Sequence, residues 1–294
     1  MKKLSIFALL GSLLLLLAAC EDDPASPEMT TSNLNLQISG LEDLGNSALY
    51  EGWIMVDGAP QTTGTFSVDA NGNMSSTSFE IDSDDLSNAT AFILTIEPNP
   101  DPSPDPSDTH ILAGDFSGSS ASLSISHPAA LGTDFSSSMG TYILATPTNG
   151  ADTDEKSGIW FLDLSSGSPA VGLSLPTLPS GWKYEGWTVI NGMPVTSGTF
   201  LSVTDFDDAD PFSSTMAGPP FPGEDYLVNA PSGLTFPTDI SGGMAVISVE
   251  PYPDNSTAPF TLKPLVGSIP SDAMDHTNYD MGLNASFPTG TATK

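Results

Sequence analysis

The chain has no arginine and very few basic residues. Its 294 residues include 36 aspartates and glutamates but only six lysines, which gives a formal net charge of −30 at pH 7. A surface this acidic repels phosphate groups, so nucleic acids and anionic lipid headgroups are excluded as partners. We interpret the charge as a strongly hydrated surface suited to a salty medium, where ions screen the repulsion between like charges.

Cysteine is nearly absent, since Cys20 is the only one in the chain. A single cysteine forms no disulfide within the chain, so stability must come from apolar cores or from bound ions. Cys20 follows an apolar run (residues 4–19) that begins after Lys2 and Lys3, which is the pattern of a secretory signal. This arrangement resembles the lipobox of bacterial lipoproteins, in which the cysteine is acylated and becomes the new N-terminus.

The resemblance predicts a cleaved signal peptide over residues 1–19 and an acylated Cys20 that anchors the chain in the lipid bilayer. Residues 20–33 then form a flexible acidic tether. The acidic residues 21–23 resemble signals that carry some lipoproteins to the cell surface. We therefore expect a membrane-anchored, extracytoplasmic protein, with the outer membrane or the cell surface favoured. The alternatives to a lipoprotein signal are an uncleaved anchor helix or a plain secretory signal. The alternative to an export signal at residues 21–23 is an ordinary acidic linker.

The common catalytic motifs are also absent. The sequence has no Gly-x-Ser-x-Gly, P-loop, His-Glu-x-x-His or cysteine cluster. Its three histidines, His110, His127 and His276, do not occupy equivalent positions in the repeat described next. A lone surface histidine is more often inert than catalytic. We therefore expect no enzymatic activity.

One phrase of the sequence occurs twice. Residues 50–53, Tyr-Glu-Gly-Trp, return as residues 184–187, and the same offset carries Gly58, Pro60, Gly64 and Phe66 onto equivalent residues. A fixed offset held over this length indicates a duplicated domain. The structural residues of the repeat are Tyr50, Glu51, Trp53 and Glu97 in the first copy, and Tyr184, Glu185, Trp187 and Glu250 in the second.

The local pattern predicts an all-β fold. Apolar residues 34, 36 and 38 alternate with polar ones, and the short apolar runs 91–96 and 244–249 are bounded by turn residues. Asp57-Gly58 and Asn191-Gly192 favour equivalent tight hairpin turns. We predict two tandem β-sandwich domains, over residues 34–139 and 140–294. The second begins with a hairpin and carries an acidic, proline-rich insertion between residues 200 and 250.

The repeated motifs resemble a known family. Each copy has Tyr-Glu-Gly-Trp, then Gly-x-Pro-x-x-x-Gly-x-Phe, then a strand ending in Glu-Pro with a proline-rich loop, and then Leu-Ala-Gly (residues 112–114) or Leu-Val-Gly (residues 265–267). This order resembles the extracytoplasmic C-terminal domain of anti-sigma-K factors. Members of that family hold a sigma factor with a cytoplasmic domain that precedes a membrane span. Because this chain begins with a signal, the resemblance implies the sensory or binding half alone.

The repeated glutamates, Glu51 with Glu97 and Glu185 with Glu250, have two interpretations. We favour a structural one for both pairs, in which Glu51 is half-buried and accepts hydrogen bonds from backbone amides, and Glu97 lies where the chain leaves its strand. A glycosidase also uses two carboxylates about 5–10 Å apart, so a carbohydrate-active enzyme is the alternative. Trp160 and Trp182 occur only around the second copy, and they are the candidates for stacking on a sugar ligand.

Four aspartates of the insertion, Asp205, Asp207, Asp208 and Asp210, are the candidate metal ligands. Calcium needs several oxygen ligands, which one short acidic loop can supply; the alternative is a solvated turn. The sequence as a whole predicts a non-catalytic, membrane-anchored lipoprotein that acts as an extracytoplasmic binding or sensory module. Its expected partners are the bilayer, through acylated Cys20, and an envelope protein or a glycan. An indirect regulator in envelope or anti-sigma-type signalling is the alternative function.

Overall fold

A computed structural model describes residues 30–254 and 256–294. The predicted signal peptide, Cys20 and most of the predicted tether lie outside the described residues. The tether was expected to extend to residue 33, but strand β1 (Thr31–Ser39) begins earlier. Its first three residues pair with strand β4 (Ser78–Asp82). Backbone pairing needs no apolar side chains, which is why the polar start of β1 did not read as a strand.

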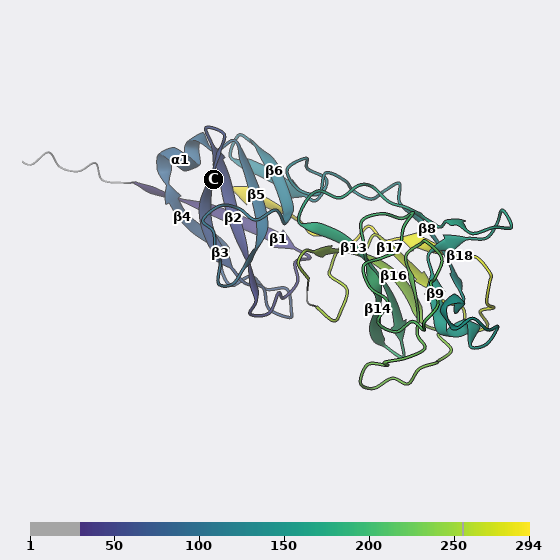
Figure 1. Cartoon of the computed structure of the whole chain (residues 1–294). Coiled ribbons are helices and arrows are strands. Elements are labelled where there is room, and N and C mark those ends of the chain that lie inside the picture. The colour runs from purple at the N-terminus through teal and green to yellow at the C-terminus, as the bar shows by residue number, and fades with distance from the viewer. Residues whose placement is uncertain (1–29, 255) are drawn as a thin grey trace, which may run out of the picture. The chain divides into compact units, whose positions relative to one another are not determined.

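The first sheet has eight strands, and all neighbouring strands in it are antiparallel (Figure 1). In spatial order they are β3 (Ala59–Phe66), β2 (Ala48–Val56), β5 (Ala91–Pro98), β6 (His110–Ser117), β7 (Ser120–Ser124), β19 (Thr289–Thr293), β1 and β4. A short helix, α1 (Ser83–Asn88), follows β4. It was not predicted. Asp82 caps it by accepting hydrogen bonds from the backbone N–H groups of Asp84 and Asp85.

The first four strands of the second sheet follow the same order as their counterparts in the first, β3, β2, β5 and β6. Its main path is β14 (Met193–Phe200), β13 (Trp182–Ile190), β16 (Met244–Pro251), β17 (Leu265–Ser268), β18 (Tyr279–Leu283), β8 (Met139–Leu144), β9 (Gly158–Trp160) and β15 (Gly223–Asp225). Strand β12 (Leu173–Ser174) pairs with β8, and β10 (Leu162–Asp163) pairs with β11 (Ala170–Val171). Two 3₁₀ turns, η1 (Pro147–Asn149) and η2 (Glu155–Ser157), lie between β8 and β9. The predicted all-β fold with two sandwich-like bodies is confirmed, as is the predicted β8–β9 hairpin.

The repeated phrase lies in the middle of equivalent strands, β2 and β13. Both strands turn tightly into the next one, and the turn residues Asp57, Gly58, Asn191 and Gly192 all have positive φ between 51° and 82°. The predicted hairpins are therefore confirmed.

The glycine of the phrase is required by packing. A Cβ on Gly186 would lie 2.2 Å from Ser197 Oγ and 2.7 Å from the ring of Phe161. The equivalent Gly52 has the same environment, with Thr63 Oγ1 at 2.4 Å and Phe92 at 2.9 Å. Both distances are too short for any side chain, so glycine is fixed at this position in each copy.

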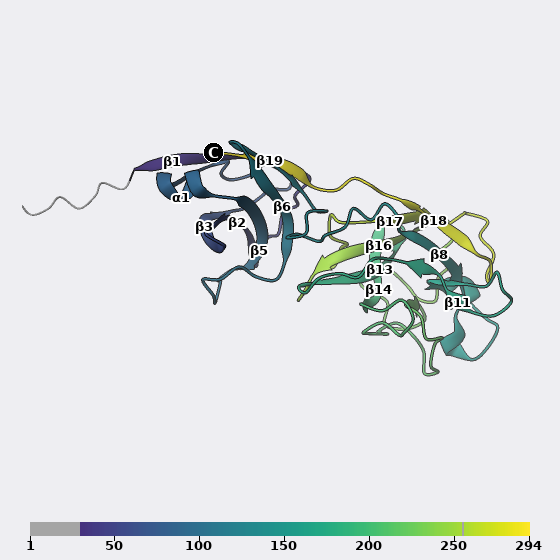
Figure 2. The same cartoon turned by 90° about the horizontal axis from the view of Figure 1, so that it is seen from above.

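The predicted limit of the second domain is wrong at its C-terminal end. We expected residues 140–294 to form one sandwich, but β19 leaves the second sheet and inserts between β1 and β7 of the first. Figure 2 shows β19 alongside β1. Ala292 of β19 is fully buried there. The first sandwich is therefore completed by the last residues of the chain, because β1 and β7 both have free edges that a short alternating strand can pair.

Candidate functional site

The aromatic residues of the repeat are buried and pack against neighbouring strands. In the second copy, the ring of Tyr184 stacks on Phe200 at 5.6 Å, and its hydroxyl donates to the carbonyl of Pro176 at 2.6 Å. Trp187 is buried, and its Nε1 donates to Ser248 Oγ at 2.8 Å. The first copy repeats these contacts with Tyr50, Phe66, Glu42, Trp53 and Thr95. These side chains hold β2, β3, β5 and their counterparts in place.

The two repeated glutamates of the second copy meet on one face of the sheet. Glu185 lies on β13 opposite Ser248 of β16, and Glu250 lies two residues farther along β16. Such diagonal neighbours on adjacent strands are within reach of long side chains. Glu185 accepts a hydrogen bond from the Thr196 hydroxyl, and both glutamates are nearly inaccessible, with exposed fractions of 6% and 1%.

Only one of the two carboxylate oxygens of Glu250 accepts hydrogen bonds from the described residues. Its Oε1 accepts hydrogen bonds from the Ser248 hydroxyl and from the backbone N–H of Phe260, the latter at 2.9 Å. Its Oε2 is buried and has no hydrogen-bond partner among the described residues. Backbone donation was predicted for Glu51, which instead accepts from the Thr62 hydroxyl. Backbone N–H groups donate to Glu250 and to Glu97, which accepts from Ser107 N at 2.9 Å.

A third carboxylate completes the group. Asp254 follows β16 in a loop, is partly buried, and accepts a hydrogen bond from Ser256 N at 2.8 Å. One carboxylate oxygen from each of Glu185, Glu250 and Asp254 lies within 4.8 Å of the other two. We call these three residues the carboxylate site. The described residues contain no other group of three acidic, histidine or cysteine side chains this close together.

Burial dominates the electrostatics of the carboxylate site. It raises the pKa of Glu250 to about 8, against the lowering effect of the bonds from Ser248 and Phe260, and the negative charges of Asp254 and Glu185 raise it further. Burial also raises the pKa of Glu185 to about 7, with the Thr196 bond lowering it and Asp254 raising it. In the absence of a cation, both glutamates are therefore partly protonated near neutral pH.

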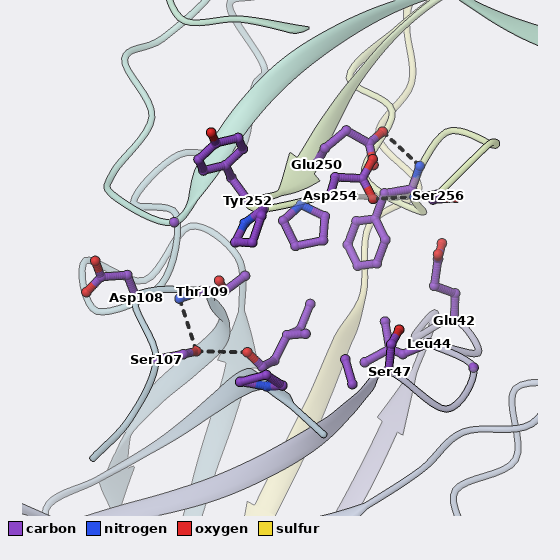
Figure 3. A pocket seen from close by; sticks show the side chains of 18 of the residues that line it. Glu42, Leu44, Ser47, Ser107, Asp108, Thr109, Glu250, Tyr252, Asp254 and Ser256 are labelled. Atoms are coloured by element: carbon purple, nitrogen blue, oxygen red, sulfur yellow. Dashed lines mark hydrogen bonds between the residues drawn. The ribbon is translucent and has the colours of Figure 1, made fainter. Parts of the chain in front are cut away.

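Two members of the carboxylate site open onto a pocket of about 800 Å³ (Figure 3). Glu250 and Asp254 line it together with Tyr252, whose ring is 52% exposed. Glu42 adds a further carboxyl group, and burial raises its pKa to about 7, against the opposing effect of the Lys263 charge. The remaining walls include Leu44, Ser47, Ile96, Ser107, Thr109 and Phe260. Asp43 and Asp108 also line the pocket, so carboxyl groups are spread around it, and we call the part beside Glu250 and Asp254 its acidic end.

The first copy carries the same residues in a looser arrangement, in which burial and then the charges of Glu97 and Asp101 raise the pKa of Glu51. Glu51 accepts from the Thr62 hydroxyl, as Glu185 does from Thr196, and Asp101 follows Glu97 by the same four residues that separate Asp254 from Glu250. Glu51, Glu97 and Asp101 nevertheless do not form a convergent group, and Asp101 is exposed. Sequence reasoning missed Asp254, although the repeated pattern Glu-Pro-x-Pro-Asp at residues 97–101 and 250–254 was the signal that could have found it.

The aspartates predicted to bind calcium do not converge. Asp205, Asp208 and Asp210 are exposed, and Asp207 is partly buried. Asp207 accepts a hydrogen bond from Gly223 N at 2.9 Å, while Asp208 pairs with Lys183 and accepts from the Thr199 hydroxyl. None of the four belongs to the convergent group. Their partners hold the insertion against the sheet, and the geometry does not support a shared ion on this segment.

The tryptophans predicted to stack on a sugar are buried. Trp160 is 4% exposed, and its Nε1 donates to Asp225 Oδ1 at 2.7 Å. Trp182 is 2% exposed and packs against Phe260 at 6.1 Å between ring centroids. Neither ring offers a free face to a ligand. The prediction was wrong because a tryptophan outside the repeat can still fill the core of the body that contains it.

Comparison with known proteins returned no match to a family model, a curated protein or a solved structure. The resemblance to anti-sigma-K factors therefore stays a prediction. Among the described residues, no helix has the length and apolar character needed to cross a membrane.

Proposed function

We propose that the chain is a non-catalytic lipoprotein, anchored to a membrane through Cys20, that acts as an extracytoplasmic binding or sensory module. The observation that supports the binding role is the pocket of about 800 Å³ onto which Glu250 and Asp254 open. Pockets that hold small molecules have volumes of about 300–1,000 Å³. The pocket therefore has room for a ligand, and its acidic end gives that ligand a preferred charge.

The expected ligand is positively charged. Glu42, Glu250 and Asp254 line the pocket, and the chain as a whole carries a net charge of −30. A cleft lined by one sign of charge concentrates ions of the opposite sign. Burial raises the pKa of Glu42 and of Glu250, so a cation that binds there must displace protons from them.

The geometry of the two glutamates favours binding over glycoside hydrolysis. Their carboxylates approach within 4.8 Å, and their exposed fractions are 6% and 1%. A glycosidase needs a sugar ring between its two carboxylates, with both accessible to the substrate. Glu185 and Glu250 are too deeply buried for a sugar substrate to contact both carboxylates.

Thermal unfolding of the full-length chain in detergent tests the binding role. Calcium chloride and spermidine serve as cationic probes, with sodium sulfate and a maltooligosaccharide as anionic and neutral ones. A ligand of the folded state raises the melting temperature by mass action. We expect at least one cationic probe to do so, less in Asp254→Asn than in the matched first-copy variant Asp101→Asn. If no probe acts, the binding role is wrong; if only the sugar acts, the ligand is a glycan and the charge argument is wrong.

The anchor is tested separately by Cys20→Ser. We expect the wild-type chain in the membrane fraction, labelled by acyl-chain precursors and accessible to protease from outside the cytoplasm. The variant should lose the label and leave the membrane fraction. A variant that stays in the membrane would contradict anchoring through Cys20.

A further inference from the structure

One atom of the carboxylate site has an unexplained environment. Glu250 is 1% exposed, and its Oε2 has no hydrogen-bond partner among the described residues. Leaving a buried polar atom without a partner is unfavourable, and the cost is larger for a charged group. The ion pairs of the described residues include none between Lys263 and the carboxylate site, although the charges of Lys263 and Glu250 are close enough to interact. A cation from outside the protein would give the ionised Oε2 the partner that it lacks.

The spacing of the carboxylates matches the size of a calcium ion. Calcium binds oxygens at about 2.3–2.6 Å, so two oxygens on opposite sides of the ion are at most about 5 Å apart. The three carboxylate oxygens lie within 4.8 Å of one another, which satisfies this limit. Magnesium binds at about 2.0–2.1 Å and demands a more regular octahedron, so the same oxygens would have to move closer together.

The chemistry of the ligand set agrees with the spacing. Each of the three residues offers a carboxylate oxygen, and hard cations prefer such ligands. Glu185 and Glu250 project from neighbouring strands, β13 and β16, and are held by hydrogen bonds to Thr196, Ser248 and Phe260. Asp254 closes the site from a loop, next to Glu250 (Figure 3). Two rigid ligands and one on a loop allow an ion to enter from the pocket.

We propose that Glu185, Glu250 and Asp254 bind one divalent cation of the calcium class. The ion sits at the acidic end of the pocket, and Oε2 of Glu250 is one of its ligands. Its remaining coordination positions face the pocket and take water. This inference rests on the proposed binding function, and it names the ligand that binds at the acidic end of the pocket.

Terbium luminescence tests the proposal directly. Terbium replaces calcium at oxygen sites and emits when a nearby tryptophan is excited. Trp187 is suitably placed, since it donates to Ser248, which donates to Glu250. With the full-length chain stripped by a chelator, we expect terbium emission that calcium displaces, together with a calcium-dependent rise in melting temperature. Magnesium should compete more weakly.

The two copies of the repeat supply matched controls. Glu250→Gln and Asp254→Asn should lose the terbium emission and the calcium response, while Glu97→Gln and Asp101→Asn should keep both. Asp254 is only partly buried, so its variant reports on binding even if Glu250→Gln fails to fold. The proposal is overturned if the wild-type chain does not respond to calcium, or if the first-copy variants lose the response equally. If calcium fails while spermidine still raises the melting temperature, the proposed binding function stands without the metal.

Discussion

Replacing Glu250 by glutamine should stabilise the metal-free protein at alkaline pH. The amide oxygen of glutamine can still accept the bonds from Ser248 and Phe260 that Oε1 accepts now. The amide nitrogen takes the place of the unpartnered Oε2 and can donate to Glu185 or Asp254, whose carboxylate oxygens lie within 4.8 Å. The substitution thus removes a buried charge and adds a donor among acceptors.

The size of the effect follows from the pKa of Glu250, which is raised from 4.5 to about 8. A carboxyl whose pKa is higher in the folded state stabilises the fold below pH 4.5, and this contribution is lost as the pH rises through about 8. Since one pKa unit corresponds to about 1.4 kcal/mol, the upper limit of the loss is about 5 kcal/mol. Protein interiors screen buried charges more than a dry medium would, so we expect about 2 kcal/mol.

Chemical denaturation in the presence of a chelator measures this difference. The free energy of unfolding of Glu250→Gln should exceed that of the wild-type chain by about 2 kcal/mol at pH 8 and match it at pH 5 to within about 0.5 kcal/mol. Repulsion across the acidic surface also grows with pH, but it affects both proteins alike. Glu97→Gln measures how the same substitution in the first copy changes the free energy of unfolding. The reasoning is refuted if Glu250→Gln is equally destabilised at both pH values.

The remaining predictions concern packing and topology. Gly186→Ala should lower the free energy of unfolding by about 1–3 kcal/mol, since its Cβ would lie 2.2 Å from Ser197 Oγ; a fully stable variant would show that the strand can shift. Trp160→Phe should cost about 1–3 kcal/mol in a denaturant titration, because Asp225 then loses a buried donor. Deletion of residues 289–294 should speed amide exchange in β1 and β7, the neighbours of β19, and leave the exchange of β13 and β14 unchanged. Exchange that stays slow in β1 would contradict the observed pairing.

The offset in the sequence was enough to place the paired hairpins. Residues that recur at a fixed spacing serve the same local structure. The repeat therefore predicted that the hairpin of β2 and β3 has a counterpart in β13 and β14, with an equivalent turn. The pairing of β19 with β1 was beyond such reasoning. The two strands are almost the whole chain apart, and residues 289–293, Thr-Gly-Thr-Ala-Thr, carry little apolar character.

The candidate site, too, could be predicted from the sequence only in part. The repeat identified Glu185 and Glu250 as residues with a common role, because the same glutamates recur in the first copy. It could not show that the carboxylates converge in one copy and stay apart in the other. That difference depends on how the loops after β5 and β16 are placed, and these loops differ in sequence beyond Asp101 and Asp254. The burial of Trp160 and Trp182 was hidden for the same reason.

The position of β19 also sets the order in which the two sheets are completed during synthesis of the chain. A polypeptide made from its N-terminus presents β1 and β7 long before β19 exists, so the first sandwich waits with two unpaired edges while the second is completed. Closing the sheet then joins residues 35 and 293, which makes it a step of high contact order and therefore a slow one. Without β19, strands β1 and β7 each keep an unpaired edge, and such edges can pair with other extended chains.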